Sequence, residues 1–295
     1  MLPDVLPCLR CPFCHAALAA HGDGSARVLC CPAGHSFDVA RQGHVDLLGR
    51  RSAHDGDTAE MVAARDRFLR AGHFAVISDG VVRAARTQLV AADRFADADR
   101  LTRPPGPFVV DAGAGTGNYL AAVLDAVPGG VGLALDIAKA AVRRAARAHP
   151  AAAAVRCDTW QALPLADGVA DLVLNVFAPR NGAEFARVLR PGGALLMVTP
   201  LPDHLGEVVG PLGLLGVDPD KEGRIVAALG DHLVEVSRHP LRRRLRLSHG
   251  EVEALVAMGP SARHADPDRL AARLATLPDP VPVTVAVQLT VHRRR

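Results

Sequence analysis

Four metal-binding side chains lie near the start of the sequence, at a spacing that suits one tetrahedral ion. Cys11 and Cys14 form a Cys-x2-Cys pair, and after sixteen further residues Cys31 and His35 form a Cys-x3-His pair. Zinc takes four thiolate or imidazole ligands in structural sites, and four protein ligands leave no place for a catalytic water. The spacing therefore predicts a structural Zn2+ site that holds a small N-terminal module together.

The same stretch contains two further cysteines, so the ligand set has an alternative register. Cys8 also forms a Cys-x2-Cys pair with Cys11, and Cys30 directly precedes Cys31. We favour the first set because a proline directly follows both Cys11 and Cys31, which gives matching turns in the two halves. Five of the six cysteines crowd the first 31 residues, a pattern that favours a metal site in a reducing cytoplasm over a disulfide framework.

A second group of residues has the types needed to bind a nucleoside cofactor. The stretch VVDAGAGTGNYL places an acid and three glycines where an apolar strand is expected to turn into a helix. An acid also stands at the end of each of the next two expected strands, where it can reach ribose hydroxyls or the base. The cofactor-binding residues predicted from this pattern are Asp111, Gly113, Gly115, Gly117, Asp136 and Asp158.

Two cofactors compete for this glycine loop, a nicotinamide dinucleotide and S-adenosylmethionine. A loop that binds pyrophosphate prefers GxGxxG, whereas this loop reads Gly-Ala-Gly-Thr-Gly and keeps Asp111 two residues before its first glycine. That acid can hold the amino-acid part of S-adenosylmethionine, directly or through water. The pattern therefore favours a class I S-adenosylmethionine-dependent methyltransferase over a dehydrogenase.

The segment NVFAPRN, at the end of a later strand, offers candidate catalytic residues for contact with the methyl acceptor. The Asn175 amide can donate to or accept from a base edge, and the Phe177 ring can stack on a base. No side chain here is an obvious general base, so alignment of the acceptor with the methyl group is expected to supply most of the rate. The alternative interpretation is a purely structural strand end.

These residues need a scaffold, and the sequence predicts an α/β fold. From Phe108 onward apolar strands alternate with helices, which is typical of a Rossmann-like parallel sheet covered by helices on both faces. The last two β-rich runs, at 232–248 and 281–295, have no obvious crossover between them and are expected to form an antiparallel edge. The segment before the sheet has helical periodicity, with Thr58 and Ser78 as expected N-caps.

The composition supports three functional regions in an ordinary globular protein. We divide the chain into a zinc-binding, RNA-recognition module (1–50), a helical linker region (51–105) and a Rossmann-like methyltransferase domain (106–295). The net charge of +3 is too small to demonstrate a nucleic-acid partner, although the stretch RHPLRRRLR at 238–246 is strongly basic. No apolar stretch approaches the roughly 20 residues that span a bilayer, so we expect no membrane partner.

Over nearly its whole length the sequence resembles the RlmA-type methyltransferases, which methylate N1 of a guanine in 23S ribosomal RNA. The resemblance lies in the zinc module with HSFDVARQGHVDLL, and in DTAEMVAARDRFLRAGHF, VVDAGAGTG, NVFAPRN, LRPGG and VTPLPDHL. The pieces NVFAPRN, DKEGR and VAMGPS look most like the actinobacterial branch that is linked to tylosin-type macrolide resistance.

The resemblance implies zinc ligands at the four positions named above and cofactor contacts from Phe74, Gly115, Thr116 and His204. It also implies a homodimer with a basic cleft for an RNA hairpin. The implied target is a guanine in the loop of helix 35 of 23S rRNA, with guanine 748 favoured over guanine 745 because of the resistance branch.

Two other functions remain open from the residues alone. The chain could be a methyltransferase that acts on a small molecule, or a non-catalytic RNA-binding protein with a degenerate cofactor site. The basic stretches and the whole-length resemblance disfavour the first, and the complete set of glycines and acids disfavours the second. We expect the zinc module to select the RNA substrate, through arginines such as Arg10, Arg27 and Arg41.

Overall fold

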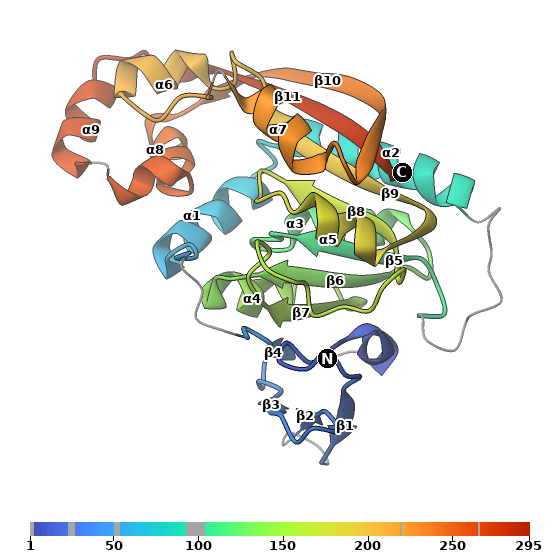
Figure 1. The fold of residues 1–295 in the computed structure, drawn as a ribbon. Helices are drawn as coiled ribbons and strands as arrows, with labels where there is room; N and C mark the ends of the chain where they lie inside the picture. Colours follow the sequence, from blue (N-terminus) through green and yellow to red (C-terminus); the bar gives the residue numbers. More distant parts are fainter. Residues whose placement is uncertain (1–2, 23–26, 50–53, 93–103, 219, 265) are drawn as a thin grey trace.

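An eight-stranded sheet forms the centre of the molecule (Figure 1). The structure is a computed structural model that describes residues 3–22, 27–49, 54–92, 104–218, 220–264 and 266–295. The sheet contains, in spatial order, β10 (Leu233–Leu247), β11 (Val281–Arg294), β9 (Leu189–Pro200), β8 (Ala170–Val176), β5 (Phe108–Ala112), β6 (Val131–Asp136), β7 (Ala152–Arg156) and β4 (His44–Asp46). Strands β9 to β4 are parallel, so their carboxyl ends meet at one edge, where ligands bind in open α/β sheets.

Helices and loops cover both faces of the sheet, and each face has its own hydrophobic core. The first core packs under α1 (Ala59–Arg70), α2 (Ala75–Ala92), α3 (Asn118–Ala126), α4 (Lys139–Ala145), α6 (Gly206–Leu212), α8 (His249–Ala257) and α9 (Pro267–Leu274). The second core packs under α5 (Gly182–Val188), α7 (Lys221–Leu229) and the N-terminal module. The predicted α/β fold with helices on both faces is therefore confirmed.

The N-terminal module is fused to the sheet. Its own antiparallel sheet, β1 (Ala19–His21), β2 (Val28–Cys30) and β3 (Ser36–Asp38), follows the short 3-10 helix η1 (Pro3–Cys8). Val5, Leu9 and Leu29 are buried in the same core as sheet residues such as Val110 and Leu133. Strand β4 then extends the main sheet in parallel beside β7, and Figure 1 shows the module in blue at this edge.

The two expected helix N-caps have different outcomes. Thr58 caps α1, and its hydroxyl accepts a hydrogen bond from the amide of Met61 at 3.3 Å. The prediction for Ser78 is wrong, because α2 begins at Ala75 and contains Ser78 in its first turn. A turn at Gly72 (φ +80°) directs the chain into the helix earlier, and this places Ile77 in the core.

Strands β10 and β11 confirm the expected antiparallel edge. They pair over nearly their full length, with β11 also antiparallel to β9. Helices α8 and α9 lie in the connection between the two strands. None of the helices in the described ranges combines the length and the apolar character needed to cross a membrane.

Candidate cofactor and metal sites

The four predicted zinc ligands come together at one point of the N-terminal module. The ligand atoms of Cys11, Cys14, Cys31 and His35 all lie within 4.8 Å of one another. His35 Nδ1 is 3.3 Å from Cys31 Sγ and 3.5 Å from Cys11 Sγ, and Cys14 Sγ is 3.6 Å from Cys31 Sγ. A tetrahedral Zn2+ with bonds of about 2.0–2.3 Å has ligand separations of roughly 3.3–3.8 Å, so this set fits the ion.

The surroundings of Cys31 favour the thiolate form that zinc requires. Burial alone would raise the pKa of Cys31, but hydrogen bonds from the His35 backbone, Cys14 and the His35 ring outweigh it and lower the pKa to about 6. The alternative cysteines lie outside the cluster, Cys8 buried at the end of η1 and Cys30 half-buried in β2.

The glycine loop between β5 and α3 has a backbone that larger residues would disrupt. Gly113 has φ +82°, and a Cβ there would lie 2.4 Å from the Ala178 side chain. Gly117 has φ +78°, and a Cβ there would lie 3.0 Å from Cα of Ala145. Two successive loop amides, beginning with Gly113, donate to the carbonyl of Leu135 at 2.9 Å. The loop is thus built for close backbone approach to a ligand, and it also contains Gly115 and buried Thr116.

Asp111 is a buried carboxyl group that makes no hydrogen bond of normal geometry. The residue is only 1% exposed, and neither carboxyl oxygen has a hydrogen bond. Burial, with a smaller contribution from the charge of Asp136, raises its pKa to about 8, and only the approach of the Leu120 backbone amide acts in the opposite direction. An unpaired buried carboxyl group is costly, and a cationic ligand group would satisfy it. The ammonium of the S-adenosylmethionine amino-acid part supplies that charge, so the residues fit the cofactor.

Asp136 ties the glycine loop to the end of β6. Its Oδ2 accepts from the amide of Gly115 at 2.8 Å, and its Oδ1 accepts from the amide of Ala138 at 2.8 Å. Burial raises its pKa despite these bonds. A carboxylate offers about four acceptor positions, so two remain for the ribose hydroxyls that are expected at this strand end.

Asp158 lies at the end of β7 in a turn that already uses it as an acceptor. Its oxygens accept from the amide of Trp160 at 3.0 Å and from the amide side chain of Gln161 at 3.1 Å. His54 Nδ1 approaches to 3.3 Å, and its ring stacks on Trp160 with centroids 5.8 Å apart. Asp158 therefore stabilises the turn, and the side chains of His54 and Trp160 lie beside it.

Three aromatic rings from different elements meet beside the glycine loop. Phe74 is 6.1 Å from His204 and 6.4 Å from Phe177, and Phe177 is 5.7 Å from His204, between ring centroids. His204 Nδ1 accepts a hydrogen bond from the amide of Ala286 at 3.1 Å. That bond places the proton of the neutral ring on Nε2, so the ring presents a donor there.

Asn175 holds the backbone turn that presents Phe177. Its amide nitrogen donates to the carbonyls of Ala112 at 3.2 Å and Pro179 at 2.7 Å. Phe177 has φ +53°, a left-handed conformation that costs a bulky residue roughly 1–3 kcal/mol, and it is 42% exposed. The two predicted catalytic residues thus meet in one turn, where Asn175 positions the backbone and Phe177 exposes its ring.

Arg65 is a further candidate for the cofactor site, and the sequence did not single it out. It lies on α1, and a Cβ on Gly115 would be 3.4 Å from its Nη1. It forms an ion pair with Asp57, and its Nη2 donates to the carbonyl of Met258 at 2.7 Å. Helical periodicity marks Arg65 only as a polar position, and nothing in the pattern shows that α1 approaches a loop fifty residues later.

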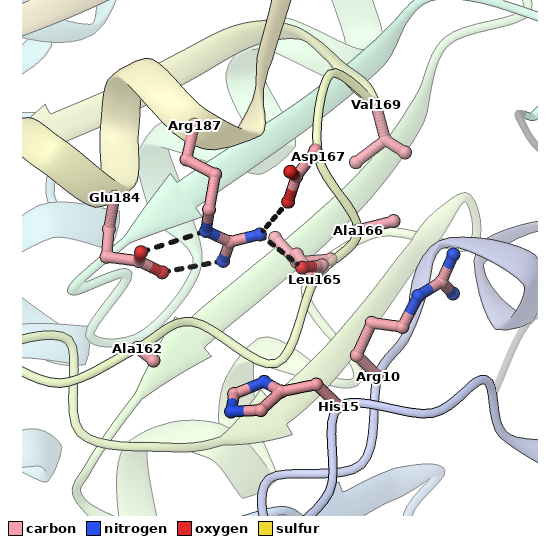
Figure 2. A pocket seen from close by; sticks show the side chains of 9 residues that line it. All are labelled: Arg10, His15, Ala162, Leu165, Ala166, Asp167, Val169, Glu184 and Arg187. Carbon is pink, nitrogen blue, oxygen red and sulfur yellow. Dashed lines mark hydrogen bonds and ion pairs between the residues drawn. The ribbon is translucent and has the colours of Figure 1, made fainter.

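A separate pocket of about 620 Å³ lies at the seam between the module and the sheet (Figure 2). The guanidinium of Arg187 dominates its upper wall and bonds Glu184, Asp167 and the carbonyl of Leu165. His15 and Arg10 of the module face it from the other side. None of the predicted cofactor residues lines this pocket, and its charged groups largely neutralise one another, so it is not the cofactor site.

The sheet order, the glycine loop with its buried acid and the four-ligand cluster define a class I S-adenosylmethionine-dependent methyltransferase with a zinc ribbon. Family models agree: one described as "RlmA, N-terminal" matches residues 9–52, and one for a methyltransferase domain matches residues 109–193.

Full-length relatives define the family. A protein of Streptomyces fradiae named 23S rRNA (guanine(748)-N(1))-methyltransferase is 48% identical over 99% of both chains. A protein of Micromonospora griseorubida, provisionally named as a 23S rRNA (guanine-N(1)-)-methyltransferase, is 55% identical over 99% of both chains. A similarly named Bacillus subtilis protein, YxjB, is 27% identical over 88% of this chain and 89% of its own. This chain belongs to the family of 23S rRNA (guanine-N1)-methyltransferases.

Proposed function

We propose that the protein transfers the methyl group of S-adenosylmethionine to N1 of guanine 748 in the loop of helix 35 of 23S rRNA. The choice of guanine 748 is supported by the 48% identity, over 99% of both chains, to the Streptomyces fradiae enzyme named for that guanine. The buried and unpaired Asp111 beside the glycine loop supports an active cofactor site over a degenerate one.

The cofactor supplies an electrophilic methyl group on a sulfonium. Asp111 would accept from its ammonium, and Asp136 would accept from the ribose hydroxyls. Arg65 lies against Gly115 and already binds one carboxylate, that of Asp57, so it would donate to the carboxylate of the cofactor. Asp158 and its turn would border the adenine.

The three-ring cluster would receive the target base. Phe177 would stack on a guanine that is flipped out of the RNA, and Asn175 would act as a positioning residue through the turn it holds. His204 is not assigned the role of general base, because its Nδ1 already accepts a hydrogen bond from the Ala286 amide. Its Nε2–H would instead donate to guanine O6, where negative charge develops when N1 loses its proton to water.

The zinc module would select the RNA. In its first half, Phe13 is 50% exposed and stacks on Phe37, with centroids 6.1 Å apart and planes inclined by 12°. Arg27 and Arg41 of the module are also exposed. An aromatic platform and arginines on a metal-fixed turn suit an unpaired base and its phosphates at little ordering cost.

We extend the proposal to the setting of the enzyme. The three-part division is proposed as a zinc-binding, RNA-recognition module at 1–50, a helical linker region at 51–105 and a methyltransferase domain at 106–295. Exposed aliphatic side chains on α7 and β10, Val226, Val234 and Val236, support a homodimer, which light scattering would test.

Ribosomal RNA as substrate supports a cytoplasmic location. The similarity to the Streptomyces fradiae protein supports tylosin resistance, which can be tested by measuring inhibitory concentrations of tylosin in a susceptible host.

A label-transfer assay tests the proposed substrate. The protein is incubated with S-adenosylmethionine labelled in its methyl group and with helix 35 hairpins in which guanine 748 or guanine 745 is replaced by adenine. We expect transfer to the unmodified hairpin and to the 745 variant, and none to the 748 variant. Transfer only to a small-molecule fraction of a cell extract would show that the substrate is not RNA.

A further inference from the structure

The strongly basic stretch of the sequence forms the middle and end of the edge strand β10. Across the pair with β11, Arg242 lies opposite Ala286 and Arg244 lies opposite Thr284. Side chains alternate along a strand, so Arg238, Arg242, Arg244 and Arg246 share one side of it. We call these four residues the arginine face.

The arginine face points away from α2 and from the first core. The alternate residues Leu241 and Leu245 pack against the core under α2, and Leu241 occupies the space beside Gly80 of that helix. The arginine face therefore lies on the other side of the sheet, which is also the side that the zinc module covers at the opposite edge. Figure 1 shows β10 and the module at these two edges.

The positive charge of this face is only partly neutralised. Arg242 is ion-paired with Asp203, and Arg238 with Glu235. The side chains of Arg244 and Arg246 are exposed and make no hydrogen bond or ion pair within the described part of the chain, although the charge of Arg244 lowers the pKa of Glu207. Exposed guanidinium groups with free donors are suited to bind phosphate oxygens in a bidentate manner.

The arginine face begins at the rim of the methyl-transfer site. Asp203, the partner of Arg242, directly precedes His204 of the three-ring cluster. The β11 residues opposite Arg242 and Arg244 hold the same loop, because the Ala286 amide donates to His204 Nδ1 at 3.1 Å and the Thr284 carbonyl accepts from the Leu205 amide at 2.8 Å. A strand of RNA that leaves the site in this direction meets the arginines.

From Arg238 to Arg246, past the exposed valines at the start of β10, charge favours a polyanion over a second copy of the chain. The residues from Arg238 to Arg246 span about 27 Å at about 3.4 Å per residue, enough to follow several phosphates. Antiparallel self-pairing of β10 about Arg242 would place Arg238 opposite Arg246 and Arg242 opposite itself. Like charges directly opposite are destabilising, and such charges protect edge strands from pairing.

We propose that the arginine face binds the phosphate backbone of the RNA strand that flanks the target guanine, while the zinc module holds the RNA at the other edge of the sheet. This inference rests on the proposed function. The inference adds an RNA-binding surface beside the three-ring cluster. Neither the glycine loop nor the zinc cluster provides such a surface.

A matched pair of double variants tests the inference. Arg244→Gln with Arg246→Gln removes two charges from the arginine face, and Arg83→Gln with Arg86→Gln removes two exposed charges from α2. Binding of a helix 35 hairpin is measured by fluorescence anisotropy over a series of salt concentrations. We expect the first variant to bind about tenfold or more weakly and its salt slope to fall by about 0.7–0.9 for each phosphate that it no longer neutralises. We expect the control to match the wild type.

The outcomes separate this inference from the proposed function. Equal weakening of both double variants, or an unchanged salt slope in the first, would overturn the arginine face as the binding surface. A changed oligomeric state of the first variant in light scattering would assign the edge to a second copy instead. If the wild type binds the hairpin through these arginines but does not methylate it, the inference holds and the proposed function fails.

Discussion

The zinc cluster and the cofactor site both gather polar groups in sheltered places, but they satisfy them differently. In the cluster, the four ligand atoms lie within 4.8 Å of one another, and a single Zn2+ would use them all. In the proposed cofactor site, Asp111 is buried without a hydrogen bond of normal geometry, and Phe177 holds a left-handed backbone with an exposed ring. Groups that are fully used hold the fold together, whereas groups kept unsatisfied or strained await a ligand.

The two sites are nevertheless joined through the sheet. The amide of Leu47, just after β4, donates to the carbonyl of Arg156 at 2.9 Å, and Asp158 follows two residues later. The amide of Arg10 donates to the carbonyl of Pro164 in the loop that follows Asp158. We therefore expect the metal to stabilise one wall of the proposed cofactor site without taking part in the chemistry.

Loss of the metal should have the largest effect. Cys11→Ser removes a buried ligand, and structural zinc contributes on the order of 10 kcal/mol to the folding of small zinc domains. We expect the zinc content to fall and thermal unfolding to occur more than about 10 °C lower, as measured by metal analysis and calorimetry. Cys30→Ser, outside the cluster, is the control. An unchanged unfolding temperature after zinc loss would show that the module does not support the sheet.

Asp111→Asn should separate binding from stability. The Asp111 pKa of about 8 lies above its ordinary value of 3.8, so between these values the folded state holds more protons than the unfolded state. Stability without cofactor therefore falls as the pH rises through this range. The Asn variant should unfold at a higher temperature than the wild type at pH 8, with a smaller difference at pH 5.

The same variant should bind the cofactor about 50-fold more weakly in calorimetric titration, because a charge-assisted hydrogen bond to the ammonium is removed. Asp125→Asn, at a largely exposed position on α3, is the control. A variant that is less stable than the wild type at pH 8 and binds the cofactor normally would show that Asp111 is a structural residue.

Arg65→Met should weaken cofactor binding about tenfold through the carboxylate alone. We expect loss of affinity for S-adenosylhomocysteine but not for methylthioadenosine, which lacks the amino-acid part, and partial recovery in Arg65→Lys. Arg67→Met, exposed on the same helix, is the control. Equal loss for both ligands would mean that Arg65 acts only by joining α1 to α8.

Phe177→Gly should show the smallest change in stability and a specific change in activity. Glycine adopts φ +53° without strain, so the free energy of unfolding should stay the same or rise by about 1 kcal/mol. Methyl transfer should fall at least tenfold while cofactor affinity changes less than threefold. Phe177→Leu keeps the strain and the bulk as a comparison. Full activity in the Gly variant would exclude a stacking role.

The sequence predicted the features that depend on local pattern. The zinc ligands have a fixed spacing, and the glycine loop stands between an apolar strand and a helix, so both could be found without coordinates. The antiparallel pair β10–β11 was also expected, because its two β-rich runs lack an obvious crossover. These features depend on residues close together in the chain or on general rules for how strands of a sheet are connected.

Features that depend on packing between distant segments could not be predicted. Arg65 reaches Gly115 only because α1 packs against both the loop and α8, and no periodicity reports that contact. The addition of β4 to the main sheet was hidden, since three residues carry too little pattern to mark a strand. Asn175 was expected as a candidate, but its hold on the Phe177 turn needed the positions of the Ala112 and Pro179 carbonyls.

Primer extension on 23S rRNA, after incubation with S-adenosylmethionine and the protein, is the most direct test of this account. It tests whether the zinc site is structural and whether Asp111 is kept available for the cofactor. Methylation at N1 blocks base pairing, so reverse transcriptase should stop beside guanine 748 with the wild type. The folded, zinc-loaded Asp111→Asn variant should give a much weaker stop at a limiting cofactor concentration. No stop with a wild type that binds the cofactor, or an equal stop with both proteins at limiting cofactor, would contradict the account.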